Sequence, residues 1–417
     1  MHFPLHPSAS LAVLLFAMAS NAAAQDADYW ISTWSGIYKL ERATHKLRFV
    51  TNGVGTPYYA QWWNGNLIVP DFENDRVWTV APDGTTTLLA SGNHVDEPVT
   101  VAVSPSNELW VTSVDGDKVL TIDAAGNQTL RMDTTTYPWM DTPSGMSFLP
   151  DGTLYLGQYE SGDVWHCDPA TGLATMITDG AGVMDECAAI HADNSGNIFC
   201  ADFEIGQIVR VRVEDGSCVV ISNDPILEEV TDLRVTKEGT ILATSLANSA
   251  LLEIEMDGTT TVLLQAIALG PMEGISVPKD FPYSTGSIAK YGSGLAGSGG
   301  FIPDLRGILS PTIGGVVGLE HRFALGGTWG FTLFGIAPAV IPVWGGTLLV
   351  DWNQPFGLLP LSFGGSGAGA GESVVFDELP NDPTLIGAIF FLQDLVVDPG
   401  ALKKVALSNG IEFTIGS

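Results

Sequence analysis

The sequence predicts an all-β fold, and three observations lead to that expectation. Short apolar strands recur in groups across residues 25–280, separated by turns that contain Gly and Asp. Beyond residue 300 the chain becomes rich in Gly and in apolar, strand-like segments. The residue after the first turn of each group recurs at intervals of 42, 45, 44 and 43 residues, at Leu67, Leu109, Leu154, Ile198 and Ile241. A repeat of this length is typical of a four-stranded propeller blade, so the sequence predicts a six-bladed β-propeller followed by a Gly-rich β-sandwich domain.

Six segments open a repeat and are expected to be the innermost strands around the centre of the propeller. They start at Tyr58, Val99, Gly145, Cys187, Thr231 and Gly274. Residues 28–34 resemble a second strand with no inner strand before it, whereas the strand at Gly274 has no second strand after it. We expect these two segments to pair in one blade, which would close the ring and leave no exposed sheet edge.

The N-terminus contains an apolar run, Leu11–Ala19, followed by three small residues at Ala22–Ala24. This pattern is typical of a secretory signal peptide, so we expect residues 1–24 to be removed on export. The mature chain is then expected to be secreted, in the periplasm or outside the cell.

The chain carries a formal net charge of −30 over 417 residues. Residues 25–286 hold 37 of the 47 acidic side chains and only 12 of the 17 basic ones. A surface this acidic repels nucleic acid, which excludes nucleic-acid binding, and it favours cations and cationic ligands.

All four cysteines fall in the third and fourth full repeats. An even number in an exported chain suggests two disulfides, with three possible pairings, and no paired CxxC indicates zinc. Free structural thiols are the alternative. The candidates are Cys167, Cys187, Cys200 and Cys218.

Residues 281–300 are rich in Gly and Ser and predict a linker to a second domain over residues 301–417. Within that domain, Trp329–Val350 is long and apolar enough to raise the question of a transmembrane segment. Because Pro338, Pro342 and several glycines interrupt it, short strands are favoured and no membrane span is expected.

Carboxylates concentrate in the loops that precede the inner strands and in those that join second to third strands. In a propeller these loops meet on one face, where converging carboxylates repel one another and either take up protons or recruit a cation. We therefore expect calcium at this rim, although solvated loop charges are the simpler interpretation. The candidate ligands are Glu97, Asp141, Glu186, Asp232 and Glu273.

His191 is the one histidine inside a predicted inner strand. It could face the channel as an acid or base, but a single strand histidine is more often a core residue. The sequence contains no GxSxG elbow, no phosphate-binding loop and no HExxH motif.

Two motifs carry a resemblance to known propellers: the turn PDGTLY at Pro150–Tyr155 and the TPSG segment at Thr142–Gly145. With these motifs the first domain resembles the NHL, streptogramin lyase and senescence marker protein/gluconolactonase group. Lactonase-like members hold a divalent cation with carboxylates and Asn side chains, and the inner-strand openings here contain no Asn. Streptogramin lyases carry Glu-Pro-His-Gly in the last repeat, where this chain has Pro271–Gly274 without histidine.

The expected function is therefore first a binding or interaction propeller, whose ligand is an unknown small molecule, carbohydrate or protein. A metal-dependent lactonase or esterase is the second possibility, because a metal site needs few residues. A streptogramin-type lyase is the third. The fold alone does not discriminate among these three functions.

Five segments of the second domain carry a second resemblance: Gly294–Leu305, Gly345–Asp351, Leu379–Gln393, Asp398–Ala401 and Leu407–Gly416. With these segments the domain resembles a C-terminal module found on secreted proteins of planctomycetes and myxobacteria. The resemblance implies a bacterial, exported context and a surface or interaction role.

Overall fold

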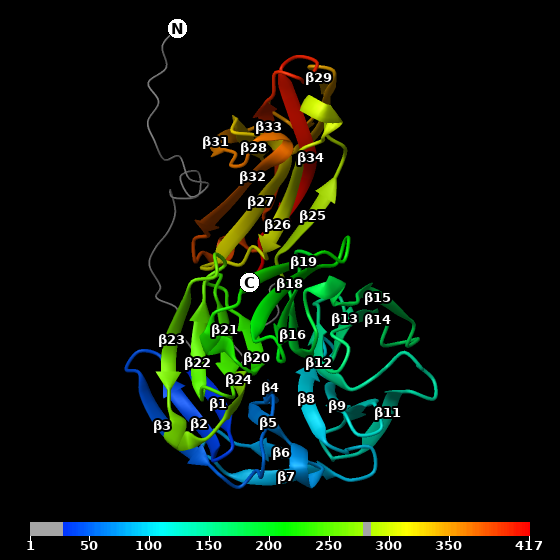
Figure 1. Cartoon of the computed structure of the whole chain (residues 1–417), viewed down its shortest axis with the longest axis vertical. Helices are drawn as coiled ribbons and strands as arrows, with labels where there is room; N and C mark the ends of the chain where they lie inside the picture. Colours follow the sequence, from blue (N-terminus) through cyan, green and yellow to red (C-terminus); the bar gives the residue numbers. More distant parts are fainter. Residues whose placement is uncertain (1–27, 278–284) are drawn as a thin grey trace.

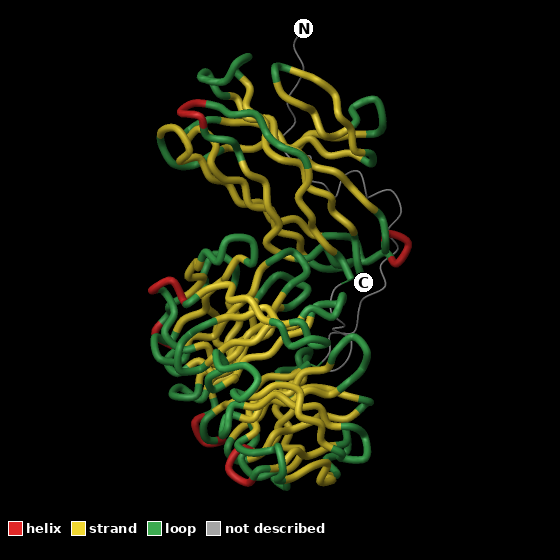
Figure 2. Tube along the Cα trace, turned by 90° about the vertical axis from the view of Figure 1, so that its right-hand side faces the viewer, coloured by secondary structure: helices red, strands yellow, loops and turns green. Residues whose placement is uncertain are grey.

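The computed structural model describes residues 28–277 and 285–417, so the predicted signal peptide lies outside the described residues. Within the described part the chain consists of β-strands and short 3-10 helices. Figure 1 shows two bodies, a broad one coloured blue to green and a narrower one coloured yellow to red above it. Figure 2 shows the same two bodies from the side, with strands in both. The all-β prediction is confirmed.

The broad body is a β-propeller. The described residues up to 277 form six four-stranded antiparallel sheets, which we call blades 1 to 6. Blade 1 contains β24 (Met272–Ser276), β1 (Tyr29–Thr33), β2 (Gly36–Glu41) and β3 (Lys46–Thr51). Blade 2 contains β4 (Gln61–Trp63), β5 (Asn66–Asp71), β6 (Arg76–Val80) and β7 (Thr86–Ser91). Blade 3 contains β8 (Pro98–Val103), β9 (Leu109–Ser113), β10 (Lys118–Ile122) and β11 (Gln128–Asp133). Blade 4 contains β12 (Pro143–Phe148), β13 (Leu154–Gln158), β14 (Val164–Cys167) and β15 (Ala174–Thr178). Blade 5 contains β16 (Cys187–Ala192), β17 (Asn197–Asp202), β18 (Gln207–Arg212) and β19 (Cys218–Ser222). Blade 6 contains β20 (Val230–Val235), β21 (Ile241–Ser245), β22 (Ala250–Ile254) and β23 (Thr260–Gln265).

Blade 1 joins the two ends of the propeller sequence. Its inner strand β24 pairs antiparallel with β1, with Trp30 opposite Ser276 and Ile31 opposite Ile275. The predicted pairing of residues 28–34 with the strand at Gly274 is therefore confirmed. Gly274 also lies against the chain before β4, because a Cβ built there would stand 2.9 Å from the carbonyl oxygen of Tyr58.

Asp-Gly turns between third and fourth strands pack blades 2 and 6 on the blade that precedes each of them. Gly84 and Gly258 have φ values of +88° and +90°, which favour glycine. A Cβ on Gly84 would lie 2.6 Å from the carbonyl oxygen of Val50, and one on Gly258 would lie 2.5 Å from that of Ile221. Each glycine thus packs against the outer strand of the neighbouring blade. Hence these two turns, visible in the sequence, also set how closely neighbouring blades approach.

Aromatic side chains fill the space between blades. Trp30 of blade 1 and Trp62 of blade 2 meet edge to face, with ring centroids 5.1 Å apart. Trp110 of blade 3 meets Phe148 of blade 4 in the same way at 5.4 Å. Edge-to-face pairs of this kind stabilise a core beyond the area they bury.

The second body is a β-sandwich region. Its core lies between the five-stranded and three-stranded sheets and includes Leu305, Leu319, Leu392 and Phe413. The five-stranded sheet contains β25 (Ser287–Tyr291), β34 (Val405–Thr414), β33 (Ile389–Val397), β28 (Trp329–Gly335) and β31 (Phe356–Ser362). The three-stranded sheet contains β26 (Asp304–Leu309), β27 (Val316–Gly326) and β32 (Gly367–Glu378). The strands β29 (Pro338–Val343) and β30 (Gly346–Val350) form a separate pair. The 3-10 helices are η1 (Phe72–Asn74), η2 (Gly180–Gly182), η3 (Pro225–Leu227), η4 (Ile267–Leu269), η5 (Ser298–Gly300) and η6 (Pro383–Leu385).

Part of the predicted linker belongs to this sandwich. Residues 281–284 lie outside the described residues, but Ser287–Tyr291 forms β25 and pairs along its length with β34. Its Ile288 packs against the sandwich core, and this apolar contact is what a Gly/Ser composition count overlooks. The segment Trp329–Val350 forms three strands, as expected. No helix in the described residues is long and apolar enough to cross a membrane.

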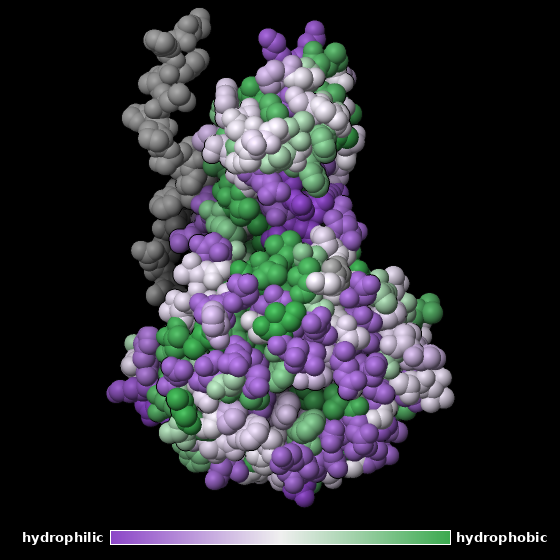
Figure 3. All heavy atoms as spheres, viewed as in Figure 1, coloured by the Kyte–Doolittle hydropathy of each residue, from purple (hydrophilic) through white to green (hydrophobic). Residues whose placement is uncertain are grey.

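The two bodies meet through blades 5 and 6. Ile308 and Leu309 of β26 pack into a buried cluster made mostly of propeller residues. Beside them, Glu320 of β27 accepts hydrogen bonds from Arg210 at 3.0 Å and from Arg212, both on β18 of blade 5. All three ionic side chains are largely buried. Figure 3 shows hydrophilic residues gathered at the narrow waist where the two bodies join.

Candidate functional site

The propeller channel has two ends, which the chain direction distinguishes. We call the end where loops lead into the inner strands the loop face, and the opposite end, where turns join inner to second strands, the turn face. The five predicted calcium ligands belong to the loop face: Glu97, Asp141 and Glu186 precede β8, β12 and β16, and Asp232 and Glu273 lie in β20 and β24. Their environments differ strongly, because the first two are exposed, Glu186 is half-buried and the last two are buried.

Asp232 is 0% exposed and fully engaged by the protein. Its Oδ1 accepts hydrogen bonds from the amide of Leu233 at 2.8 Å and from Nη1 of Arg234 at 2.6 Å. Its Oδ2 accepts one from the amide of Ile275 at 3.0 Å. Burial raises the pKa of this carboxyl, and Arg234 and the amides oppose that rise. Asp232 therefore holds Arg234 in place.

Glu273 is the second buried carboxyl, 1% exposed. Its Oε1 accepts a hydrogen bond from Nε1 of Trp34 at 2.6 Å, and its Oε2 has no partner among the described residues. Burial raises the pKa of Glu273 to about 7, because a charged carboxylate is poorly solvated there. The group is thus partly protonated near neutral pH.

The predicted calcium ligands do not form one donor set. No three His, Cys, Asp or Glu side chains in residues 28–277 and 285–417 are placed to hold a metal ion together. Calcium prefers six to eight oxygen ligands. The arrangement therefore does not fit the ion, and calcium binding at the rim stays a prediction of the sequence alone.

The four cysteines are free thiols in the structure, in contrast to the two predicted disulfides. Cys187 and Cys200 are buried among the apolar residues between blades 4 and 5, and Cys218 packs against the same cluster. Cys167 lies in a separate cluster between blades 3 and 4. Buried cysteine behaves as a small hydrophobic side chain, which accounts for these positions without a covalent bond.

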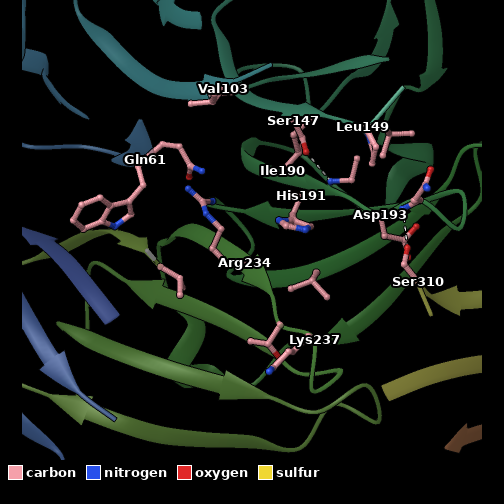
Figure 4. Close-up of a pocket in the computed structure, with 18 of the residues that line it drawn as sticks. Gln61, Val103, Ser147, Leu149, Ile190, His191, Asp193, Arg234, Lys237 and Ser310 are labelled. Carbon is pink, nitrogen blue, oxygen red and sulfur yellow. Dashed lines mark hydrogen bonds between the residues drawn. The ribbon is translucent and has the colours of Figure 1, made fainter. Parts of the chain in front are cut away.

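A cavity of about 650 Å³ occupies the turn-face end of the channel. Its wall is built by inner strands and the turns that follow them, with Gln61, Ser147, His191 and Arg234 from β4, β12, β16 and β20. Figure 4 shows these side chains around one space. The cavity is of the size that small-molecule sites have in proteins.

The sandwich closes one side of this cavity. Leu309, Ser310 and Ile313 line it from β26 and the loop after it. Oγ of Ser310 accepts a hydrogen bond from the amide of Asn194 at 2.9 Å, which fixes the loop to the turn after β16. Two separate parts of the chain therefore form the site together.

The polar groups of the wall are arranged around Arg234. Figure 4 shows Gln61 and Arg234 turned toward one another, and the two residues belong to different blades. His191 has no hydrogen-bond partner among the described residues. Burial, assisted by the charge of Arg234, lowers the pKa of His191 to about 3, so its ring is neutral at physiological pH.

The sequence interpretation considered His191 but missed Gln61, Ser147 and Arg234. One signal was present: Arg234 is one of only 17 basic residues in the chain and lies inside a predicted inner strand. A charged side chain in such a strand needs a partner or a ligand. The contribution of the sandwich could not be seen, because no sequence pattern shows which face of the propeller it covers.

Comparison with known proteins supports the fold. A chain from the crystal structure of a nidogen/laminin complex aligns with 61% of this chain and 99% of its own length, at a TM-score of 0.53 and 12% identity. This similarity shows the propeller fold alone.

Two further solved structures align at lower scores. A protein of unknown function from Bacteroides caccae aligns at a TM-score of 0.47 and 14% identity, over 61% of this chain and 100% of that one. A streptogramin B lyase aligns at 0.41 and 9% identity, over 93% of this chain and 98% of that one. No protein-family model matches the sequence, and no curated protein does.

Proposed function

We propose that this protein binds a small organic molecule in the cavity between the propeller channel and the sandwich. The observation that carries the proposal is the cavity itself, which is of ligand size and has walls from several blades and from the sandwich. The sandwich then acts as part of the binding site. Binding rather than catalysis also agrees with the missing family motifs.

The state of His191 favours binding over a lyase or hydrolase. A general base works best when its pKa lies near the working pH, and that of His191 is lowered to about 3. A metal-dependent lactonase would need a ligand set that the described residues do not supply. Neither enzymatic alternative has an observation in its favour.

The cellular context is proposed from the sequence. We infer export to the bacterial periplasm or exterior from the signal-like segment before residue 25. We assign the propeller to the NHL, streptogramin lyase and gluconolactonase-like group, with residues 25–280 as the propeller and the module from about residue 301 as the second domain. N-terminal sequencing of the exported protein tests the cleavage after Ala24.

The binding proposal can be tested by filling the cavity. Val235 lines the cavity at the end of β20, and Val219 lies on the outer strand β19, away from the cavity lining. We expect Val235→Trp to abolish binding of a naphthalene-sized probe, measured by calorimetry, because the indole would occupy the space. Val219→Trp is the matched control and should bind as the wild type does.

If the Val235 variant unfolds, judged by circular dichroism, Leu149→Trp provides a second way to fill the same cavity. Three naphthalene probes with negative, zero and positive charge should be used, so that the test does not depend on the charge of the ligand. Binding that persists in a folded, cavity-filled variant would reject the proposed site.

A further inference from the structure

Basic and acidic side chains that line the cavity are equal in number, unlike those of the strongly acidic chain as a whole. The chain carries a net charge of −30. Two basic side chains line the cavity, Arg234 and Lys237, and they are 19% and 24% exposed. The acidic lining residues, Asp193 and Asp232, are only 8% and 0% exposed. A ligand in this cavity would therefore meet positive charge first.

Both acidic lining residues are also engaged by the protein. Asp193 accepts hydrogen bonds from the amides of Ser195 and Asn197, each at 2.9 Å, and from the side chain of Asn197. Asp232 accepts three hydrogen bonds, as described above. Neither carboxylate is free to receive a cationic ligand.

Arg234 is held in one orientation. Its Nη1 donates to Oδ1 of Asp232 and to the carbonyl oxygen of Leu233, both at 2.6 Å. Its Nε and Nη2 have no partner among the described residues. A guanidinium fixed in this way presents parallel N–H groups, which match the two oxygens of a carboxylate.

Neutral donors surround this guanidinium. Neither the amide of Gln61 nor the ring of His191 has a hydrogen-bond partner among the described residues. Oγ of Ser147 accepts from the amide of Ala192 at 3.0 Å and can still donate its own proton. Because His191 is neutral, Arg234 and Lys237 are the cationic groups among the described lining residues.

Apolar side chains form part of the remaining wall. Leu149, Ile190, Val235 and Leu309 line the cavity around the polar group just described. Sites for small molecules commonly combine such a wall with a few placed polar groups that fix orientation. An amphipathic ligand would fit both parts.

We propose that the ligand is an organic carboxylate, bound through its carboxylate to Arg234 and through an apolar body to the wall formed by blades 4 to 6 and the sandwich. The inference rests on the proposed binding function and adds the chemical class of the ligand. Asp232 acts as the positioning residue, because it holds the guanidinium without touching the ligand.

The test uses calorimetry on the full chain near neutral pH with naphthaleneacetate, naphthaleneacetamide and naphthylmethylamine. We expect the acetate to bind about 10- to 100-fold more tightly than the amide, because hydrogen bonds to charged groups exceed neutral ones in strength. The amine should bind most weakly. Arg234→Gln should remove the advantage of the acetate, so that the acetate and the amide bind with similar affinity.

Two further variants serve as controls. Arg48→Gln makes the same chemical change on the outermost strand β3, where Arg48 pairs with Glu41, and should leave all three affinities unchanged. If Arg234→Gln does not fold because Asp232 loses its partner, the double variant Asp232→Asn/Arg234→Gln removes both charges together. A buried pair removed as a whole is often tolerated.

The outcomes separate this inference from the proposed function. If the acetate and the amide bind equally and Val235→Trp blocks both, the proposal of a carboxylate ligand is rejected, whereas the proposed binding site is retained. An acetate preference that survives in Arg234→Gln would also overturn it. Binding of none of the three probes would reject both proposals.

Discussion

The loop face and the turn face are two ends of one channel, yet the same chain builds them differently. Toward the loop face, the buried carboxyl of Glu273 is engaged by a single nearby donor, Trp34. At the turn face, inner strands and the sandwich enclose a common cavity. The candidate site is therefore indicated by an enclosed cavity with a few charged groups fixed by hydrogen bonds, and not by a high density of charge.

The cover over the turn face depends on a buried ionic cluster. Glu320 is the shared partner of Arg210 and Arg212, whose side chains are almost fully buried. Burial lowers the pKa of Arg212 to about 9 and that of Arg210 to about 10, so their charged forms are already costly there. Removing the carboxylate would leave two buried charges without their partner.

The largest effect is therefore expected for Glu320→Ala. We expect it to lower the free energy of unfolding by about 3–5 kcal/mol, measured by urea denaturation, because a buried charge loses its partner. Glu372→Ala is the matched control on the same sandwich, where an exposed carboxylate lies 3.8 Å from Arg322. The control should change stability by less than about 1 kcal/mol. Equal effects would mean that the sandwich does not cover the turn face in solution.

A smaller effect, dependent on pH, is expected at the loop face. The folded-state pKa of Glu273 is raised to about 7, above its usual value of 4.5. Between these values the folded state holds a proton that the unfolded state has lost, so stability falls as pH rises. Above the folded-state pKa the penalty is constant, at about 3 kcal/mol.

Glu273→Gln should remove this dependence, because glutamine resembles the protonated acid and can still accept from Trp34. We expect the variant to match the wild type at about pH 4.5 and to exceed its stability by up to about 3 kcal/mol above pH 8, measured by urea denaturation. Glu160→Gln, at an exposed position on the same face, should not alter the pH profile. A variant that is less stable than the wild type at high pH would show that the Glu273 carboxylate is charged and stabilised.

Much of the fold could be predicted because the repeat is local. The Asp-Gly turns at Gly84 and Gly258, the inner strands and the closure of β24 on β1 follow from spacing and alternation along the chain. The site could not be predicted to the same degree. Asp232, only two residues away, holds the guanidinium of Arg234. The role of Arg234 in the site, however, depends on a cavity that Leu309 helps to close, and such proximity between distant segments leaves no periodic signal.

The smallest effect is expected at the outer rim of the loop face, for Glu97→Gln. Glu97 is exposed; its pKa is raised by partial burial and by the neighbouring charges of Asp115, Asp96 and Asp75, so neutralising it relieves a weak repulsion. We expect a change in the free energy of unfolding within about 0.5 kcal/mol, as for most surface positions. The measurement should be repeated with excess calcium chloride. If calcium stabilises the wild type and not Glu97→Gln, carboxylates that lie apart in the structure must gather around the ion. The loop face would then be a second ligand site, and the contrast between the two faces would no longer hold.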